Sequence, residues 1–493
     1  MGPTSKFSRT FALWSVKSRR LYLMFMLAYG CFSQNLLRVN MSVGVVCMVN
    51  NTALIHHRNR STHPNDTGAN VCALPKNARA QYEGPLLWSA ADQSLQFTVT
   101  YWGTLVGSLL TGWLADRYGP MKFWILAAVL AIFGNLLTPL AALYGPLIMG
   151  ACRFLVGVGQ GIIVPVAYAW VSRWFPAYEK ATALAFFTTG NQLSSIIGYP
   201  LTAYLCDRGW QFVFYGTTFF VLPFVFVCAT LVHDSPAKSK ILSAEEKQFL
   251  VRETSASKRQ KRARVPWLGM LTSPAMISLT GMQISGSVVV AVLQSYIPTY
   301  YKNALALRLE KNGWLSALPF VSQMVVKMAV TPLADRTRRK RPHLTLWVCK
   351  VSNSIGAFTT AACFCALMFV DCRNSTVGVT LLIAAAGSWG FFVPGFMSSN
   401  VSLAPAFAGT VSSITQICGR LATVVTFYII GASMKDSTPA EWQWVFLAMG
   451  GMVLATGSAF LAFGSSEAQS WAAPQVMEEA KGNEAEKAAI EKY

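Results

Sequence analysis

Long apolar runs dominate this chain of 493 residues. About twelve of them reach the roughly 20 residues that a helix needs to cross the hydrocarbon core of a bilayer. Because 53% of the residues are apolar and only 13% are charged, the composition excludes both an ordinary soluble domain and a disordered chain. We therefore expect an all-α integral membrane protein with about twelve spans. Their approximate ranges are 22–48, 87–113, 122–144, 146–170, 180–205, 212–232, 273–300, 312–333, 343–370, 377–402, 409–433 and 442–464.

The distribution of positive side chains predicts the orientation of these spans. About 26 of the 41 Lys and Arg residues fall in the tails and loops of one side, against about 10 on the other. Short cytoplasmic loops collect positive residues, so we expect tails 1–21 and 465–493 and the central loop 233–272 to be cytoplasmic. The net charge of +20 then needs no nucleic-acid partner.

The opposite side carries glycosylation signals. Loop 49–86 has Asn-x-Ser/Thr sequences at Asn50, Asn59 and Asn65, and a second outer loop has one at Asn374. These positions agree with the predicted orientation. Similar sequences at Asn40 and Asn400 fall inside predicted spans, and we interpret them as chance.

The cysteines and histidines give little support for enzyme chemistry. Most of the 11 Cys lie within spans, while Cys72, Cys206 and Cys372 lie on or near the oxidising side, where one disulfide is possible but its pairing is open. Metal-ligand spacing and catalytic motifs are missing from the sequence. We therefore expect neither an enzyme nor a bound cofactor, with Na⁺ or Cl⁻ as a candidate coupling or modulating ion.

The two halves of the chain repeat short sequences. The segment 114–117 (Leu-Ala-Asp-Arg) recurs at 333–336, and Trp210-Gln211 recurs as Trp442-Gln443, about 220 to 230 residues later. This spacing predicts two parallel six-helix repeats, 22–232 and 273–464, that can rock about a site between them.

Five cations lie within the predicted spans, and the one acid there, Asp92, is near an outer end. Each Arg or Lys at the centre of a bilayer costs about 2.5 to 3.5 kcal/mol, unless it faces water or an anion. A cavity lined by unpaired cations therefore predicts an anionic substrate. Lys350 is close enough to the cytoplasmic end to reach the interface instead. The cations are Arg38, Arg153, Lys327, Lys350 and Arg420.

Helical spacing aligns several polar residues. Asn35, Arg38 and Ser42 share one face of their span, as do Arg153 and Gln160 of theirs. Such side chains can also bond neighbouring helices or their own backbone, so packing remains an alternative. Further stripes contain Thr188, Asn191, Gln192 and Ser195; Gln283, Ser287 and Gln294; Ser316, Gln323, Lys327 and Thr331; and Ser413, Gln416 and Arg420. The glycines at 157, 159 and 161 predict close helix packing.

The loop Gly112-x-x-x-Asp116-Arg117-x-Gly119 resembles the signature of the major facilitator superfamily. This resemblance implies that Asp116 and Arg117, with the repeated Asp335 and Arg336, latch helices on the cytoplasmic side. Many further segments resemble the anion/cation symporter family, which includes sodium/phosphate cotransporters, the lysosomal sialic acid exporter and the vesicular glutamate transporters. They include 37–43, Trp174-x-Pro176-x-x-Glu179, 234–236, 265–267, 297–300, 403–405 and 441–443.

The family resemblance implies roles for single residues. Arg38 and Arg153 match arginines that the family uses for substrate anions, and Tyr101 matches a cavity aromatic. Gln160 stands where vesicular and lysosomal members have a proton-coupling glutamate, which favours coupling to sodium, chloride or voltage. Asn400 stands where vesicular glutamate transporters have a histidine.

The sequence thus predicts a symporter-like transporter of phosphate, urate or a carboxylate. Arg38, Arg153, Tyr101, Gln160, Asn35, Lys327, Arg420 and Asn400 are its candidate substrate residues. Its expected partners are the small anion and the lipid bilayer, in a monomer. The tail lacks an acidic dileucine signal, which favours the plasma membrane over lysosomal or vesicular membranes. A sensor or scaffold that has lost transport, and an anion channel, remain the alternatives.

Overall fold

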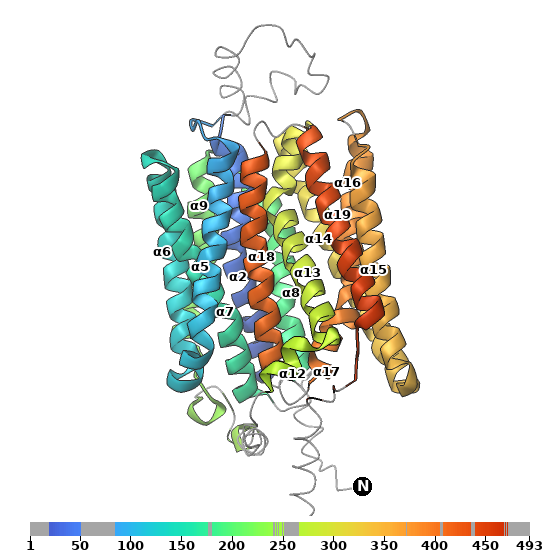
Figure 1. Ribbon diagram of the computed structural model, residues 1–493. Helices are drawn as coiled ribbons and strands as arrows, with labels where there is room; N and C mark the ends of the chain where they lie inside the picture. Colours follow the sequence, from blue (N-terminus) through green and yellow to red (C-terminus); the bar gives the residue numbers. More distant parts are fainter. Residues whose placement is uncertain are drawn as a thin grey trace, which may run out of the picture.

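The computed structural model is a bundle of long helices that run along one common direction (Figure 1). It describes residues 19–50, 84–175, 180–239, 242, 244, 246–248, 250, 266–370, 372–404, 408–434, 439–467, 469 and 471. Within these residues the extended structure is limited to one bridge between Val49 and Leu86.

Helices occupy each of the predicted span ranges. The first group consists of α2 (Arg19–Met48), α5 (Ala90–Tyr118), α6 (Pro120–Tyr144), α7 (Pro146–Trp174), α8 (Lys180–Asp207), α9 (Trp210–Phe219) and α10 (Leu222–Leu231). The second group consists of α13 (Pro274–Asn303), α14 (Leu309–Lys340), α15 (Thr345–Leu367), α16 (Ser375–Ser388), α18 (Ala408–Ser433) and α19 (Pro439–Phe463). Shorter segments are η2 (Pro236–Lys238), α12 (Trp267–Thr272), η4 (Pro342–Leu344), η5 (Cys372–Asn374), η6 (Trp389–Phe392), η7 (Val393–Met397) and α17 (Ser398–Ser402).

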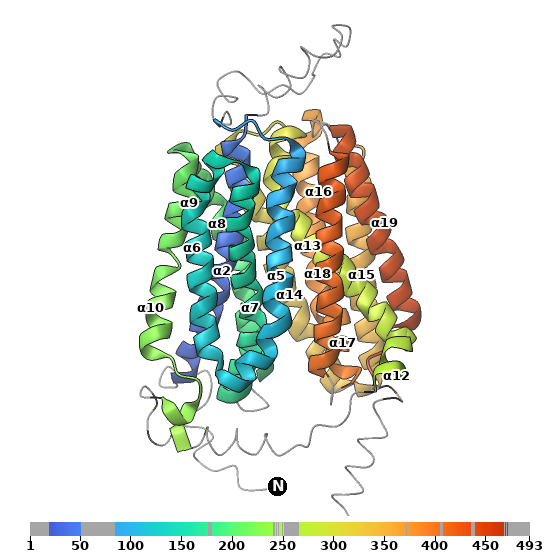
Figure 2. The ribbon, with the colours of Figure 1, turned by 60° about the vertical axis from the view of Figure 1, so that its left-hand side comes forward.

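Eight of the described helical stretches are long and apolar enough to cross a membrane. The helices in the other predicted ranges, α2, α5, α8 and α15, are more polar. Three of these, α2, α5 and α8, lie at the interface between the two groups, where α2 contacts α13, α5 contacts α18 and α8 contacts α14 (Figure 2). Polar residues on the faces of these three helices that meet the second group therefore lie toward the centre of the protein.

The contacts across the interface follow the internal repeat. Counted within each group, the second helix α5 meets the fifth helix α18, and the fifth helix α8 meets the second helix α14. The first helices, α2 and α13, meet each other. This exchange is what two parallel repeats related by an axis along the bundle produce.

Glycine–proline pairs set the sharp turns between neighbouring helices. Gly119 and Gly145 have φ of 100° and 126°, a region that favours glycine, and each precedes a proline at the start of α6 or α7. The Asp234 carboxylate accepts the backbone N–H of Met121 at 2.9 Å and so caps α6.

Close packing explains the glycines of α7. A methyl group at Gly157 or Gly161 would collide with backbone carbonyls of α5, and one at Gly159 would collide with a carbonyl of α6. These three positions have the packing role that the sequence predicted.

The bundle has two distinct ends. Arg20, at the start of α2, forms a buried ion pair with Glu246 at 3.4 Å, and Trp471, beyond α19, lies beside Gly269. The start of α2 and the chain just beyond α19 therefore both lie beside the segment that joins the two groups. We call this the central-loop end, and the opposite end, where α2 and α13 finish, the far end (Figure 1).

Candidate functional site

Arg38 lies near the middle of α2 and reaches across the interface. Its Nη2 donates to Oδ1 of Asn191 on α8 at 3.3 Å and to Oε1 of Gln294 on α13. Gln294 also donates to Oγ of Ser195 at 3.2 Å. Among the described residues, the acceptors of Arg38 are neutral amides. Its positive charge is therefore hydrogen-bonded, but no negative charge neutralises it.

A proline explains why Gln294 can serve as a contact point between the groups. Pro298 has no N–H to bond the carbonyl four residues earlier, so the backbone oxygen of Gln294 is free for other donors. Ser42 Oγ on α2 donates to that oxygen at 2.6 Å, and Tyr199 OH on α8 donates to it at 2.8 Å. The helix break in α13 is thus satisfied by the other group of helices.

Arg420 approaches the same region from α18 of the second group. It is partly exposed and within electrostatic range of Tyr101 and Arg38, and it has no hydrogen-bond or ion-pair partner among the described residues. The Arg38 guanidinium carbon lies 5.9 Å from the centre of the Tyr101 ring, whose other neighbour is Phe427 at 5.1 Å. Two guanidinium groups without a carboxylate partner among the described residues, one from each group of helices, therefore lie within electrostatic range of Tyr101.

A cavity of about 740 Å³ lies between α8 and α14, on the side of the central-loop end. Lys327 of α14 lies in its wall, and its Nζ donates to Oγ1 of Thr188 on α8 at 3.3 Å. Arg336 and Lys340 line the cavity near its mouth, with Asp335 as an acid. The described side chains thus give this opening a positive lining.

The far end, by contrast, is packed. Phe97 of α5 lies 5.1 Å from the ring of Tyr296 on α13 and 5.9 Å from that of Phe427 on α18. Ser94 Oγ and Tyr296 OH are hydrogen-bonded at 2.8 Å across the two groups. The structure is therefore open toward the central-loop end and closed toward the far end.

Arg153 occupies a different environment from the one expected of a residue that contacts substrate. Its side chain is 1% exposed and lies inside the first group, where it donates to Thr138 Oγ1, to Asn135 Oδ1 at 2.8 Å and to Leu37 O at 3.4 Å. Its guanidinium also lies 5.2 Å from the Phe214 ring. Because Leu37 precedes Arg38, Arg153 holds the backbone of α2 directly behind the Arg38 side chain.

The structure disperses the other predicted substrate residues. Gln160 is buried against α2, where it donates to the Gln34 backbone oxygen at 3.2 Å. Asn35 donates to the Cys31 backbone oxygen at 2.8 Å. Asn400 belongs to α17 at the central-loop end, away from the helix centres that carry Arg38 and Arg420 (Figure 1).

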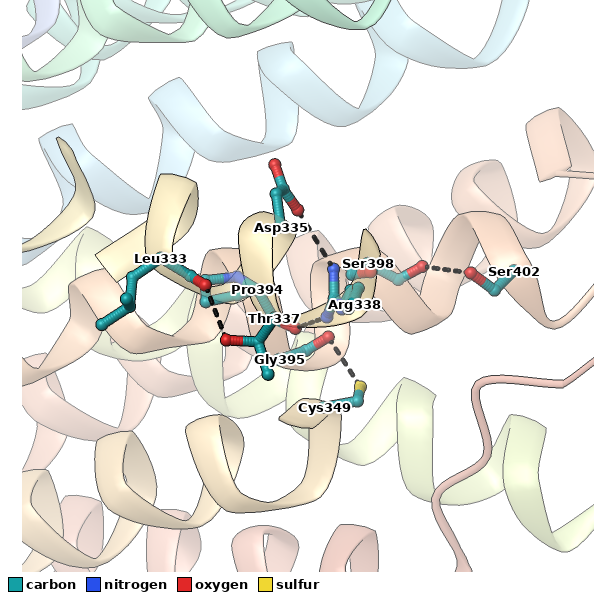
Figure 3. A network of polar contacts seen from close by, with 9 residues as sticks. All are labelled: Leu333, Asp335, Thr337, Arg338, Cys349, Pro394, Gly395, Ser398 and Ser402. Atoms are coloured by element: carbon teal, nitrogen blue, oxygen red, sulfur yellow. Dashed lines mark hydrogen bonds and ion pairs between the residues drawn. The ribbon is translucent and has the colours of Figure 1, made fainter. Parts of the chain in front are cut away.

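The predicted gate residues of the second repeat, Asp335 and Arg336, lie near the end of α14. Asp335 forms an ion pair with Arg338 at 3.5 Å, one helical turn along α14 (Figure 3). Arg336 lines the cavity. Arg338 also donates to the backbone oxygen of Pro394, beside the break in η7 at Gly395. Arg338, which the sequence reading missed, therefore joins α14 to the broken helix. The sequence does contain a signal for this residue, because an arginine three residues after an aspartate on a helix can pair with it.

The structure describes only some of the predicted gate and glycosylation residues of the first repeat and the outer loops. The side chains of Asp116 and Arg117, as well as Asn59 and Asn65, lie outside what the structure describes. Asn374 is exposed at the start of α16, and Asn50 is half-buried after α2. Asn40, whose glycosylation sequence we interpret as chance, is fully buried in α2 and donates to Asn135 and Thr217.

A disulfide joins Cys47 at the far end of α2 to Cys206 at the end of α8. The sequence indicated Cys206 but missed Cys47, because that residue falls inside the apolar run 22–48 and reads as a buried thiol. Cys72 and the Cys372 side chain lie outside the described part of the chain.

Two helical groups with a polar site between them, and a cavity between the groups at one end, are the architecture of a membrane transporter. The chain belongs to the Major Facilitator Superfamily, whose family profile matches residues 22–427. It is thus a multi-pass membrane protein and not an enzyme.

The curated relatives are members of solute carrier family 17, which confirms the resemblance read from the motifs. The chain is 30% identical to the uncharacterized transporter slc-17.3 of Caenorhabditis elegans, over 97% of this chain and 94% of that protein. It is 29% identical to sialin of Homo sapiens, over 92% and 91% of the two chains. For a putative inorganic phosphate cotransporter of Drosophila melanogaster, the identity is 27% over 92% and 87%.

Solved structures confirm the fold. The xylose transporter XylE from E. coli, in an inward open conformation, superimposes with a TM-score of 0.64 at 14% identity and covers 90% of this chain and 95% of its own. This likeness concerns the fold alone.

Proposed function

We propose that this protein is a secondary active transporter of a small anion that works by alternating access, with Arg38 and Arg420 as the residues that bind the anion. The observation that supports this most strongly is the convergence of these two guanidinium groups beside Tyr101 without a carboxylate partner among the described residues. A charge in the middle of a membrane protein is stable only when it is paired or faces water, so an anion is the natural partner. The sequence prediction of an unpaired cationic cavity rests on the same argument.

The geometry suggests how an anion enters. Arg420 has free donors, and Arg38 bonds Asn191 and Gln294 through Nη2 alone, while its Nε has no hydrogen-bond partner among the described residues. A bond between two ionised groups adds the attraction of opposite charges to the hydrogen bond, so an anion is a better partner for these guanidinium groups than a neutral amide. Because the two arginines belong to different groups of helices, one bound anion would bridge both groups.

The names of the relatives agree with an anionic substrate. They include sialin, inorganic phosphate cotransporters and vesicular glutamate transporter 2. We propose inorganic phosphate, urate or a carboxylate as substrate, and the plasma membrane as the location.

The arrangement of acids favours sodium or voltage over protons as the driving force. Within the described helices, Asp and Glu lie near helix ends, as Asp92 does in the first turn of α5, where it accepts from Ser89. Gln160 is an amide, which cannot release a proton near neutral pH. Importing a monoanion against a negative interior costs about 2.3 kcal/mol per 100 mV, so uptake would need a driving cation, whereas export would not.

Uptake into proteoliposomes tests the proposal. The purified protein is assayed with labelled phosphate, urate, sialate and glutamate under imposed sodium, proton and voltage gradients, together with the variants Arg38→Gln and Arg420→Gln. Lys350→Met is the matched control, because it removes a cation whose Nζ bonds Ala462 O near the central-loop end. We expect uphill uptake that both arginine variants reduce at least tenfold and the control leaves intact.

Three results would overturn this proposal. Anion binding without flux under any gradient indicates a sensor. Flux that neither saturates nor runs uphill indicates a channel. Unchanged uptake by both arginine variants refutes the site.

A further inference from the structure

Lys302 lies in the last turn of α13, at the closed far end. Its side chain is 8% exposed, and its Nζ donates to the backbone oxygen of Val46 on α2 at 2.9 Å. The bond thus joins the two groups of helices through a buried ammonium group.

The Val46 oxygen is a good acceptor because of how α2 ends. The N–H that would bond it within a continued helix belongs to Asn50, and that N–H bonds Leu86 O at 2.9 Å instead. The last carbonyls of a helix also carry the negative end of its dipole, which attracts a cation. Lys302 therefore satisfies an oxygen that α2 leaves open.

The two sides of this bond are fixed within different groups. The neighbour of Val46, Cys47, is tied to α8 by its disulfide with Cys206. On the other side, Asn312 of α14 donates to Pro298 O of α13 at 2.8 Å. The end of α2 is thus bound to the first group and the end of α13 to the second, so parting the groups at the far end must break the bond between Lys302 and Val46.

We propose that Lys302 is the latch of the far-end gate, which stabilises the closed state through the Val46 carbonyl and releases it when the gate opens. This inference rests on the alternating access proposed above. Neutral hydrogen bonds such as that between Ser94 and Tyr296 can be replaced by water at little loss, whereas a bond to an ammonium group is stronger. Lys302 is thereby a positioning residue for the gate and has no contact with the anion.

Cysteine labelling of the full-length protein in proteoliposomes tests the latch. Thr98→Cys reports on the far end, because Thr98 lies on α5 between Ser94 and Tyr101 and is buried beneath the closed gate. Thr189→Cys, in the wall of the cavity, reports on the central-loop end. Both are placed in a background that keeps only Cys47 and Cys206 of the native cysteines and that is shown to keep its fold, and are labelled with a membrane-impermeant maleimide.

Three substitutions at position 302 and one matched control separate the latch from general effects of charge. Lys302→Met removes the donor, Lys302→Gln keeps a neutral donor, and Lys302→Arg keeps the charge. Lys311→Met removes an exposed lysine from the same end, in the first turn of α14. We expect Lys302→Met to raise the labelling rate of Thr98→Cys about tenfold and to slow that of Thr189→Cys, with an intermediate rate for Lys302→Gln. Lys302→Arg and Lys311→Met should behave like the parent.

The result that overturns the latch is a rate at Thr98→Cys that all three substitutions at position 302 leave unchanged, or that Lys311→Met raises equally. If Lys302→Met does not fold, the comparison of Lys302→Gln with Lys302→Arg decides in the same way. Failure of the latch is distinct from failure of the proposed function: labelling needs no substrate, and the uptake assay is run on the same proteoliposomes.

Discussion

Replacing Arg420 by alanine separates a binding residue from a structural one. Because Arg420 has no hydrogen-bond or ion-pair partner among the described residues and lies within electrostatic range of Arg38, its removal relieves repulsion and breaks no described bond. We therefore expect the anion-free variant to be as stable as the parent, or more stable. Its response to the anion should be reduced, since a hydrogen bond to a charged group contributes about 1.5 to 3 kcal/mol, which is about 10- to 150-fold in affinity.

Thermal unfolding of the purified protein, followed by its tryptophan fluorescence, measures both effects. An anion at 100 times its Kd stabilises the parent by about 2.7 kcal/mol, and the same concentration would stabilise Arg420→Ala by only about 0.3 to 1.4 kcal/mol. Apparent Tm values are compared at one scan rate, because membrane proteins often unfold irreversibly. Arg420→Lys is the conservative variant: it keeps the charge but loses the paired donors of the guanidinium group, so an intermediate response is expected.

The reasoning is refuted if Arg420→Ala unfolds at a lower temperature without anion and keeps the full shift with it. That pattern would make Arg420 a structural residue. Lys350→Met again serves as the control, because it removes a cation bonded near a helix end and should keep both values.

Three further substitutions test the packing and the orientation. Arg153→Met should destabilise the protein by about 2 kcal/mol, with or without anion, because Asn135 and Thr138 lose a buried donor; the same unfolding assay measures this. Gly161→Val should cost about 1 to 3 kcal/mol or more, since its side chain would meet a carbonyl of α5, and a lower yield of monodisperse protein on gel filtration checks it. Asn374→Gln should remove one glycan from protein made in a glycosylating host, seen as a faster band on a gel; an unchanged band contradicts use of this site.

The sequence was sufficient for the architecture because the bilayer demands long apolar helices with internally satisfied backbones. It also identified Arg38 and Arg420 as unpaired charges, since the scarcity of acids within the spans is visible in composition alone. The sequence was least informative about the direction in which a side chain points. Arg153 is as deep in its span as Arg38, yet Asn135 and Thr138 of α6 enclose it, and a contact between helices cannot be read from spacing within one helix.

The sequence also did not reveal contacts to backbone oxygens that lack their usual N–H partner within the helix. The role of Gln294 follows from the absence of an N–H at Pro298, and the latch at Val46 follows from Asn50 turning to Leu86. The proline is visible in the sequence, but the donor that fills the vacant position comes from another helix. Arg338 belongs to the same class, because its acceptor is a carbonyl freed where η7 breaks.

The anion site and the far-end gate share one pair of helices. Arg38 and Val46 lie eight residues apart on α2, and their partners Gln294 and Lys302 lie eight residues apart on α13, so both bonds are about 12 Å apart along two helices that run in the same direction. An anion that draws Arg38 away from Gln294 removes one of the three described side-chain bonds between α2 and α13, and leaves the bond from Ser42 to the Gln294 backbone and the Lys302 bond to hold the two helices together. Binding at the centre would then weaken closure at the far end without any change at the gate itself, which is the coupling that an alternating-access transporter requires.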